Sequence, residues 1–374
     1  MEFVVTYTAR DVLLYATAIG FGADARYSQA DLPFCWEGSP DFTVVPTWAT
    51  TLHFWATSSP SNIAQQKDSA TATTTTGTLP SFPPPTMKTV GLLPRHCLRD
   101  PDDSDNMSKS IQDYPILHTR QIVTWNQQLK EPRSTASYRL RSRVVAVQPK
   151  SVGTFCTTQI DLFNVETTHD NDNNNDMACC TLQFTGLILG LDPELVIPWQ
   201  APDMTNLANN LPTLSFNHVK QQPTYIQRIK IPANQALVYR LASGDTNAIH
   251  VDPTANPLGE SNGDGDDDNN NNSKGSPCIL HGLCTLGIVT RVIIQQSYGR
   301  HGGWKHLQAQ WTHPICMGDT IEVQLWETTE QQMNNSNARD DATIIYFRVM
   351  LPRSGKVAVD RGVVVLNHIA QSKL

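Results

Sequence analysis

Hydrophobic and polar residues alternate along much of the chain with the two-residue period that is typical of β-strands. Residues 138–147 show this alternation through Leu140, Val144 and Ala146. Further strands are predicted at residues 155–163, 181–191, 306–311, 320–326, 342–350 and 357–366. The pattern therefore predicts a protein built mainly from antiparallel strands, with few helices.

Two segments carry the signals of a helix instead. Thr8 and Asp11 have the spacing of an N-terminal capping pair, and apolar residues 12–16 follow them. In the second half, an apolar stripe of helical period runs through Leu283, Leu286, Gly287, Thr290, Ile293 and Ile294. Residues 121–129 are a far less apolar candidate for the equivalent helix of the first half. These patterns favour an α+β fold in which a long helix lies across a strongly curved antiparallel sheet.

Polar segments and a weak internal repeat suggest how the chain is divided. Residues 58–86, 169–176 and 260–276 are rich in Thr, Ser, Pro, Asn or Asp and are interpreted as surface insertions. Calcium binding is the alternative for the Asp-rich run, although it lacks the Glu that closes an EF-hand loop. Pro-Ile-Leu-His-Thr at 115–119 is echoed by Cys-Ile-Leu-His-Gly at 278–282. We therefore expect a duplicated fold whose second copy kept the chemistry.

Length and charge limit the number of domains and the class of protein. A chain of 374 residues favours two domains, and a net charge of −7 argues against a general nucleic-acid binder. The eight cysteines lack metal-ligand spacing and are expected to be buried, reduced thiols. Neither a signal peptide nor a membrane span is expected. The chain ends in Ser372-Lys373-Leu374, a sequence read by the peroxisomal import receptor, so we expect a peroxisomal matrix protein.

Candidate chemistry gathers in residues 239–250, where Asp245, Asn247 and His250 follow the small-residue turn Ser243-Gly244. An acid and a base so close can hold one water between them, with the amide orienting it or one of the pair. Such a pair would titrate as a unit. The alternative is that Asp245 caps a helix and His250 is a satisfied surface histidine.

A second block begins at Ile279-Leu280-His281-Gly282 and leads into the predicted long helix. A glycine at a helix start lets a backbone N–H approach a ligand, and the helix dipole there favours a developing negative charge. Gly282 is therefore a candidate oxyanion donor, with close helix packing as the alternative. Together the two blocks suggest hydration of an activated alkene.

These blocks resemble the hydratase 2 family, whose signature has an aromatic and an apolar residue before Ser-Gly-Asp-x-Asn-Pro-Leu-His. Residues 239–253 and 279–285 are similar to its two blocks, and residues 7–12 and 45–47 resemble the opening of its two-domain members. The resemblance implies a double hot-dog fold, in which two curved antiparallel sheets each wrap around a central helix. It implies an N-terminal domain over 1–200 with a disordered insert at about 57–87, and a linker over 201–223. A C-terminal catalytic domain over 224–374 would carry the acidic insert at about 260–276.

The resemblance also implies roles for individual residues. Asp245 and His250 become the catalytic pair with Asn247 beside them, and Gly282 becomes the oxyanion donor. The acyl-CoA site would include His118, Thr119, Lys150, Thr246, Ala248, Ile249 and Trp311. Read without the family, Lys150 and Trp311 are an ordinary surface residue and an ordinary core residue. The chain departs from the family at Ala248, which replaces a proline, at Ile249, which replaces a leucine, and at Thr119-Arg120, which replaces Gly-Glu. It also has one extra residue between Leu241 and Gly244.

The leading functional hypothesis is an (R)-specific 2-enoyl-CoA hydratase of peroxisomal fatty-acid β-oxidation, a hydro-lyase that needs no metal or redox cofactor. The chain has no G-x-G-x-x-G fingerprint, so no fused dehydrogenase domain is expected. Two alternatives stay open: a hydratase or dehydratase of another acyl thioester, and a non-catalytic acyl-CoA-binding protein. Either a monomer or a homodimer is compatible with the sequence.

Overall fold

The computed structural model describes residues 2–23, 30–58, 80, 82–88, 93–99, 114–132, 135–165, 177–204, 221–255, 278–296, 303–333 and 339–367. The inserts predicted at 169–176 and 260–276 and the terminal Ser372-Lys373-Leu374 lie outside these residues. Most of the predicted linker, residues 205–220, lies outside them as well.

The described elements are mainly strands, as the alternating pattern predicts. The first half contains β1 (Glu2–Thr8), α1 (Ala9–Ala18), α2 (Leu32–Cys35), η1 (Pro46–Thr51), α3 (Leu52–Trp55), β2 (Thr57–Ser58), α5 (Pro85–Lys88), η2 (Arg95–Cys97), β3 (Ile116–Trp125), β4 (Thr135–Lys150), β5 (Gly153–Asn164), β6 (Cys180–Ile188), η6 (Pro193–Leu195) and β7 (Trp199–Gln200). The second contains β8 (Tyr225–Lys230), α7 (Gln235–Ser243), η8 (Ala248–His250), η9 (Pro253–Ala255), α8 (Gly282–Gln295), β9 (Trp304–Trp311), β10 (Thr320–Met333), β11 (Arg339–Leu351) and β12 (Lys356–Asn367). This composition confirms the α+β class.

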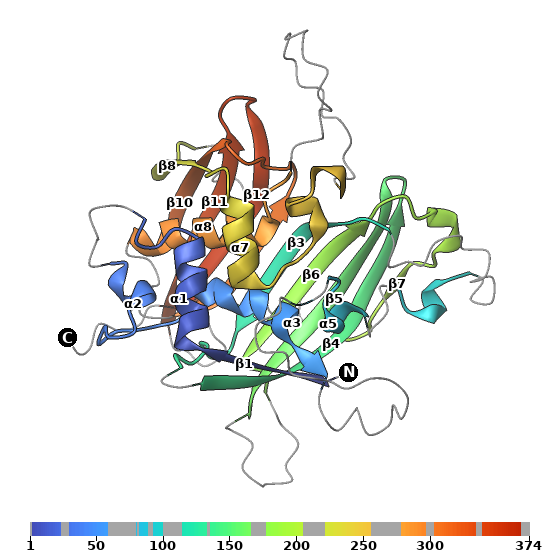
Figure 1. Cartoon of the computed structure of the whole chain (residues 1–374), viewed down its shortest axis with the longest axis horizontal. Coiled ribbons are helices and arrows are strands. Elements are labelled where there is room, and N and C mark those ends of the chain that lie inside the picture. Colours follow the sequence, from blue (N-terminus) through green and yellow to red (C-terminus); the bar gives the residue numbers. More distant parts are fainter. Residues whose placement is uncertain are drawn as a thin grey trace.

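The strands form one continuous antiparallel sheet across both halves. Its order is β2-β1-β4-β5-β6-β3-β9-β12-β11-β10-β8, with β7 paired to β4 outside this path. The halves join where β3 pairs with β9, from Arg120 opposite Gln310 to Thr124 opposite His306. Figure 1 shows β4, β5 and β6 on one side of this junction, β10, β11 and β12 on the other, and α1, α3 and α7 in front of the sheet.

The predicted central helix of the second half is confirmed as α8, which is buried along nearly its whole length. A Cβ added to Gly287 would lie 2.5 Å from Cγ2 of Ile19, so this glycine lets α1 approach α8. In the first half, the helix considered for residues 121–129 is wrong, because residues 121–125 belong to β3. Gln121, Val123 and Trp125 are buried and alternate with half-buried neighbours, which is the two-residue period of a strand. Next to α8, the first half instead supplies the short η1 segment together with the end of α1.

The insert predicted at about 57–87 is too long at both ends. Thr57 is paired with Val4 of β1, so it belongs to the sheet. Thr86 is fully buried, and its hydroxyl donates a hydrogen bond of 3.3 Å to the carbonyl of His53. The segment around α5 therefore belongs to the packed fold. None of the described helices has the length and apolar character needed to cross a membrane.

Candidate active site

The loop of residues 244–250 follows the end of α7 at a glycine that the geometry requires. Gly244 has a φ of 74°, in the left-handed region that closes many helices. A Cβ at this position would also lie 2.6 Å from Cε2 of Trp55, a residue of α3 in the first half. Backbone conformation and close packing therefore both favour glycine at the start of the loop.

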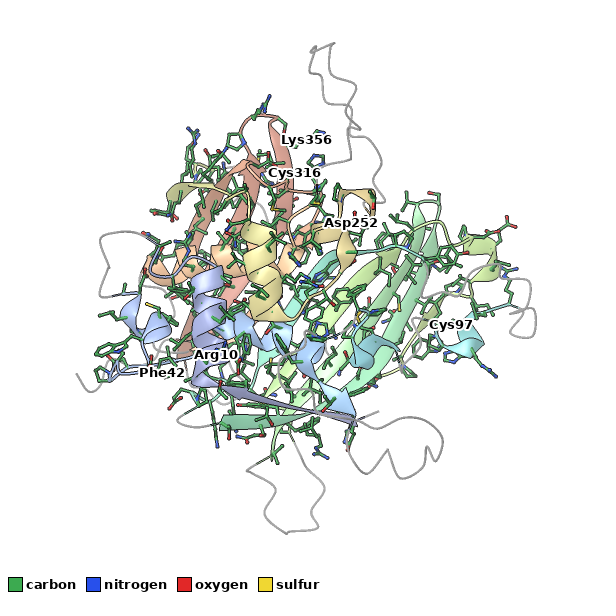
Figure 2. The ribbon with its side chains drawn as sticks, in the orientation of Figure 1. Arg10, Phe42, Cys97, Asp252, Cys316 and Lys356 are labelled. Carbon is green, nitrogen blue, oxygen red and sulfur yellow. The ribbon has the colours of Figure 1, made fainter. Side chains whose placement is uncertain are left out.

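Hydrogen bonds within the loop fix the positions of Asp245 and His250. The backbone N–H of Asn247 donates to Oδ1 of Asp245 at 3.2 Å, and Oδ1 of Asn247 accepts from the N–H of Ile249 at 3.4 Å. Asn247 thereby caps the 3-10 turn η8, which carries His250 at its end. Figure 2 labels Asp252, two residues after His250, and Cys316, the residue directly after the cavity-lining residues 311–315. The amide of Asn247 therefore acts on the orientation of the imidazole through the backbone.

His250 has a defined tautomer. Its Nδ1 lies 2.9 Å from the carbonyl oxygen of Ile279. A carbonyl can only accept a hydrogen bond, so Nδ1 must carry the hydrogen and Nε2 keeps its lone pair. His250 is only 8% exposed, which protects this arrangement from solvent. The imidazole is thus prepared to accept a proton at Nε2.

His281 is a second buried imidazole in contact with this group. Its ring stacks on that of His250, with centroids 3.8 Å apart and an interplanar angle of 28°. Its Nε2 lies 3.4 Å from the carbonyl oxygen of Asp245. Ligand-type atoms of Asp245, His250 and His281 all lie within 4.8 Å of one another, close enough for one water to contact an acid and a base together. A carboxylate oxygen and imidazole nitrogens are also ligands that suit a divalent metal ion such as zinc, although acid–base chemistry does not require one.

Burial sets the protonation states of the two candidate groups. It raises the pKa of Asp245 to about 7, while the Asn247 N–H and Arg240 oppose the shift. It lowers the pKa of His250 to about 4, and here the hydrogen bond to Ile279 opposes the shift. Near neutral pH the imidazole is uncharged and the carboxyl group keeps a substantial protonated fraction. The site therefore holds a neutral base beside a carboxylic acid.

Gly282 occupies the first position of α8, directly after His281 as N-cap. The N–H groups of a helix's first turn have no partner within the helix, and they lie at its positive end. A Cβ on Gly282 would lie 2.9 Å from Cε2 of Trp311, so the indole ring packs directly against the bare backbone. Gly282 lines the cavity and has no side chain of its own to cover this backbone N–H.

Both halves of the chain line a cavity of about 300 Å³ around these groups. The second half supplies the polar loop, the start of α8 and residues 311–315. The first half supplies a mainly apolar wall that includes Phe54, Phe82, Met87, Ile116 and Leu187. An apolar cavity with a few convergent polar groups is the usual form of a small-molecule site.

Eight of the eleven residues predicted from sequence line this cavity: Asp245, Asn247, His250, Gly282, His118, Thr119, Ile249 and Trp311. The ring of His118 lies between Phe184 and Trp311, with centroids 4.2 Å and 4.3 Å away. The other three, Lys150, Thr246 and Ala248, are outside the lining residues. Lys150 is exposed at the end of β4, Ala248 is exposed, and Thr246 donates a hydrogen bond of 2.8 Å to the Pro80 carbonyl. The roles of all eleven residues remain predictions.

Sequence reasoning missed His53, Trp55 and the contact made by His281. His281 stood within the second block, directly before the helix-start glycine, which was the available signal. His53 and Trp55 lie in a short segment whose alternation and composition carry no such signal. Their proximity to the site comes from packing between the two halves.

Comparisons with known proteins agree with this fold. A MaoC like domain matches residues 270–344. A "Probable enoyl-CoA hydratase 2" of Dictyostelium discoideum is 27% identical over 153 residues, covering 41% of this chain and 43% of the relative. A "Peroxisomal hydratase-dehydrogenase-epimerase" of Neurospora crassa is 21% identical over 355 residues, covering 95% of this chain and 29% of the relative. The chain thus spans less than half the length of these curated relatives.

Among solved structures, a MaoC-like dehydratase from Phytophthora capsici has a TM-score of 0.62 and 22% identity, covering 98% of this chain and 95% of the other. The fold is that of a double hot-dog protein, similar to the MaoC-like dehydratase. Within this fold, residues 270–344 match the MaoC like domain, and the chain is similar to relatives named enoyl-CoA hydratase 2 and peroxisomal hydratase-dehydrogenase-epimerase.

Proposed function

We propose that this protein is a hydro-lyase that adds water to trans-2-enoyl-CoA and forms (3R)-3-hydroxyacyl-CoA. The observation that carries the proposal is the buried pair of Asp245 and His250 beside the N-terminus of α8, in one cavity with an apolar wall. The configuration of the product follows the resemblance to hydratase 2. Curated relatives named enoyl-CoA hydratase 2 support the reaction class.

The proposed reaction begins with the proton of the attacking water. Nε2 of His250 accepts that proton as the oxygen attacks the β-carbon, because Nδ1 is committed to the Ile279 carbonyl. The protonated carboxyl group of Asp245 then supplies a proton to the α-carbon. The imidazolium formed can return its proton to the carboxylate nearby, which restores both groups for the next turnover.

Negative charge develops on the thioester oxygen while the β-carbon is attacked. The N–H of Gly282 is positioned to donate a hydrogen bond to that oxygen, reinforced by the helix dipole. The apolar wall from the first half houses the acyl chain and excludes bulk water. No redox step occurs, since the thioester already activates the alkene.

We further infer that the reaction serves peroxisomal fatty-acid oxidation. Relatives whose names place them in peroxisomes support this location, and Ser372-Lys373-Leu374 is the candidate import signal to be tested. A fluorescent protein fused to the N-terminus should colocalise with a peroxisomal marker, and removing Leu374 should leave the fusion in the cytosol. A cytosolic distribution of the intact fusion would contradict the assignment.

One assay tests the proposed reaction against its alternatives. The purified protein is mixed with trans-2-enoyl-CoAs from four carbons upward, and loss of the conjugated thioester is followed with chiral analysis of the product. Hydration to the (3R) product supports the proposal. Binding without hydration would identify a non-catalytic acyl-CoA-binding protein, and turnover of a different acyl thioester alone would identify another hydratase.

A further inference from the structure

The first half contributes three polar side chains, those of His53, His118 and Thr119, to an otherwise apolar wall of the cavity. His53, at the second position of α3, is 4% exposed and lines the cavity. Its neighbours in this wall include Phe54, Phe82 and Met87. The rings of His53 and Phe54 are in contact, with centroids 4.0 Å apart. An imidazole here interrupts a surface that is otherwise suited to a hydrocarbon chain.

The histidines of the cavity differ in how their ring nitrogens are used. His250 directs Nδ1 to the Ile279 carbonyl at 2.9 Å, and His118 directs Nε2 to the Arg120 carbonyl at 3.0 Å. His53 has no side-chain hydrogen bond to any residue that the structure describes, and its Nδ1 is fully buried. Its backbone carbonyl accepts a hydrogen bond from the hydroxyl of Thr86, which leaves the ring itself unpaired among the described residues. A buried polar group without a partner is costly, so an unpartnered one in a binding cavity suggests a ligand.

The charge state of His53 narrows the chemistry of that ligand. Burial lowers the pKa of His53 to about 3, so the ring is neutral at physiological pH. A neutral imidazole has one donor and one acceptor nitrogen, and it offers no charge to attract a carboxylate or a phosphate. A hydroxyl group can use either nitrogen, because it both donates and accepts.

The position of His53 places it along the acyl chain and away from the reacting carbons. The ring of His118 contacts that of Trp311, the indole against which Gly282 packs, with ring centroids 4.3 Å apart. His118 also interacts electrostatically with His53 and His250, so it lies near both imidazoles. A substrate held at Gly282 by its thioester would extend its chain past His118 to His53.

We propose that His53 is a specificity-determining residue that binds a hydroxyl group carried on the acyl chain of the substrate. The inference rests on the proposed function, since it assigns the acyl chain to the wall supplied by the first half. The favoured substrates are hydroxylated acyl thioesters. A plain hydrocarbon chain of the same length leaves the imidazole without a partner.

Binding of saturated acyl-CoAs tests this directly, because it requires no turnover. A series of one chain length, with a hydroxyl moved carbon by carbon along the chain, is compared with the unsubstituted acyl-CoA by calorimetry. At one or two adjacent positions, the wild-type protein should bind the hydroxylated chain on the order of tenfold more tightly, which corresponds to about 1.4 kcal/mol. His53→Leu should abolish or reverse this preference, whereas His53→Gln, which keeps a donor and an acceptor, should retain part of it.

Met87→Leu is the matched control, because Met87 lines the same wall without a hydrogen-bonding group. It should leave the hydroxyl preference unchanged. The proposal is overturned if the wild-type protein favours no position of the hydroxyl group on the chain. It is also overturned if the hydroxyl preference persists in His53→Leu. His53→Phe takes the place of His53→Leu if that variant fails to fold. Binding without hydration of any enoyl-CoA would instead reject the proposed function, so the two failures are distinguishable.

Discussion

The two halves of the chain share the curved antiparallel sheet, but they differ in what covers it near the cavity. The second half places the long helix α8 there, with a polar loop at its N-terminus. The first half places β3 at the junction, and the short η1 segment and the end of α1 beside α8. It also supplies most of the apolar residues that line the cavity, including Phe54, Phe82 and Met87.

This difference separates two tasks that conflict in a single hot-dog unit. A buried acid–base pair needs a rigid polar framework, whereas a long acyl chain needs an apolar space beside it. In the proposed reaction the second half carries the chemistry and the first half accommodates the acyl chain, so each half satisfies one requirement. Substitutions in each half test whether this division holds.

Substitutions in the polar pair should give the largest loss of activity. Asp245→Asn keeps the oxygen that accepts from the Asn247 N–H but cannot donate a carboxyl proton, and His250→Gln removes the base. Each should lower kcat by about 10²–10⁴-fold, the usual contribution of general acid–base catalysis. Steady-state hydration of a short enoyl-CoA, with circular dichroism to check folding, measures the effect.

The matched substitution in the first half is His118→Ala. Its ring lies between Phe184 and Trp311 as part of the wall, so its loss should raise KM more than it lowers kcat. A fall in kcat as large as that of Asp245→Asn would show that the first half takes part in the chemistry. The division of tasks would then be wrong.

Gly282→Ala should have the next largest effect. The new Cβ would lie 2.9 Å from Cε2 of Trp311, so the indole or the start of α8 must move. A displacement of this kind at a reacting centre can cost roughly 10²-fold in kcat. The control is Gly287→Ala in the same helix, which meets Ile19 at 2.5 Å. It should lower the free energy of unfolding but keep kcat, and equal losses of kcat in both variants would argue against an oxyanion role.

The sequence predicted the second half better than the first, for a physical reason. Asp245, His250 and Gly282 lie in local segments with recognisable turn and helix signals, and the long helix has a clear apolar period. His53 and Trp55 reach the site only through packing between halves, which leaves no local pattern. The same limit explains the error at residues 121–125. The position of this segment after an echoed block suggested a helix by analogy with the second half, although its own two-residue period is that of β3.

The pH dependence of activity should reflect the two groups of the second half. The base must be neutral, so activity falls as the pH drops through about 4, the pKa of His250. The acid must be protonated, so activity falls as the pH rises through about 7, the pKa of Asp245. A bell-shaped profile of kcat/KM against pH is therefore expected, and kcat/KM should fall roughly tenfold per pH unit outside these limits. Because the two groups interact, both apparent pKa values belong to the pair.

Two of these variants identify the origin of each limb. Asp245→Asn should remove the alkaline limb from its residual activity, because no carboxyl group remains to titrate. His118→Ala, in the first half, should leave both limbs in place. An alkaline limb that survives in Asp245→Asn would assign that titration to another group.

A last comparison concerns stability and not activity, at the contact by which the first half supports the loop of the second. Gly244→Ala introduces a strained left-handed φ of 74° and a Cβ 2.6 Å from Cε2 of Trp55. Gly355→Ala is the matched control, since its φ is 69° but nothing lies within 4 Å of the added Cβ. In urea unfolding, Gly355→Ala should lower the free energy of unfolding by about 1–2 kcal/mol, from backbone strain alone. Gly244→Ala should lower it by about 1–3 kcal/mol more, because the new Cβ collides with Trp55.

A double variant tests the contact between the halves. Trp55→Leu combined with Gly244→Ala should recover most of that extra loss, so the effects of the two substitutions on stability should not be additive. Strict additivity would mean that α3 does not support the loop, and that the first half contributes only a wall for the acyl chain.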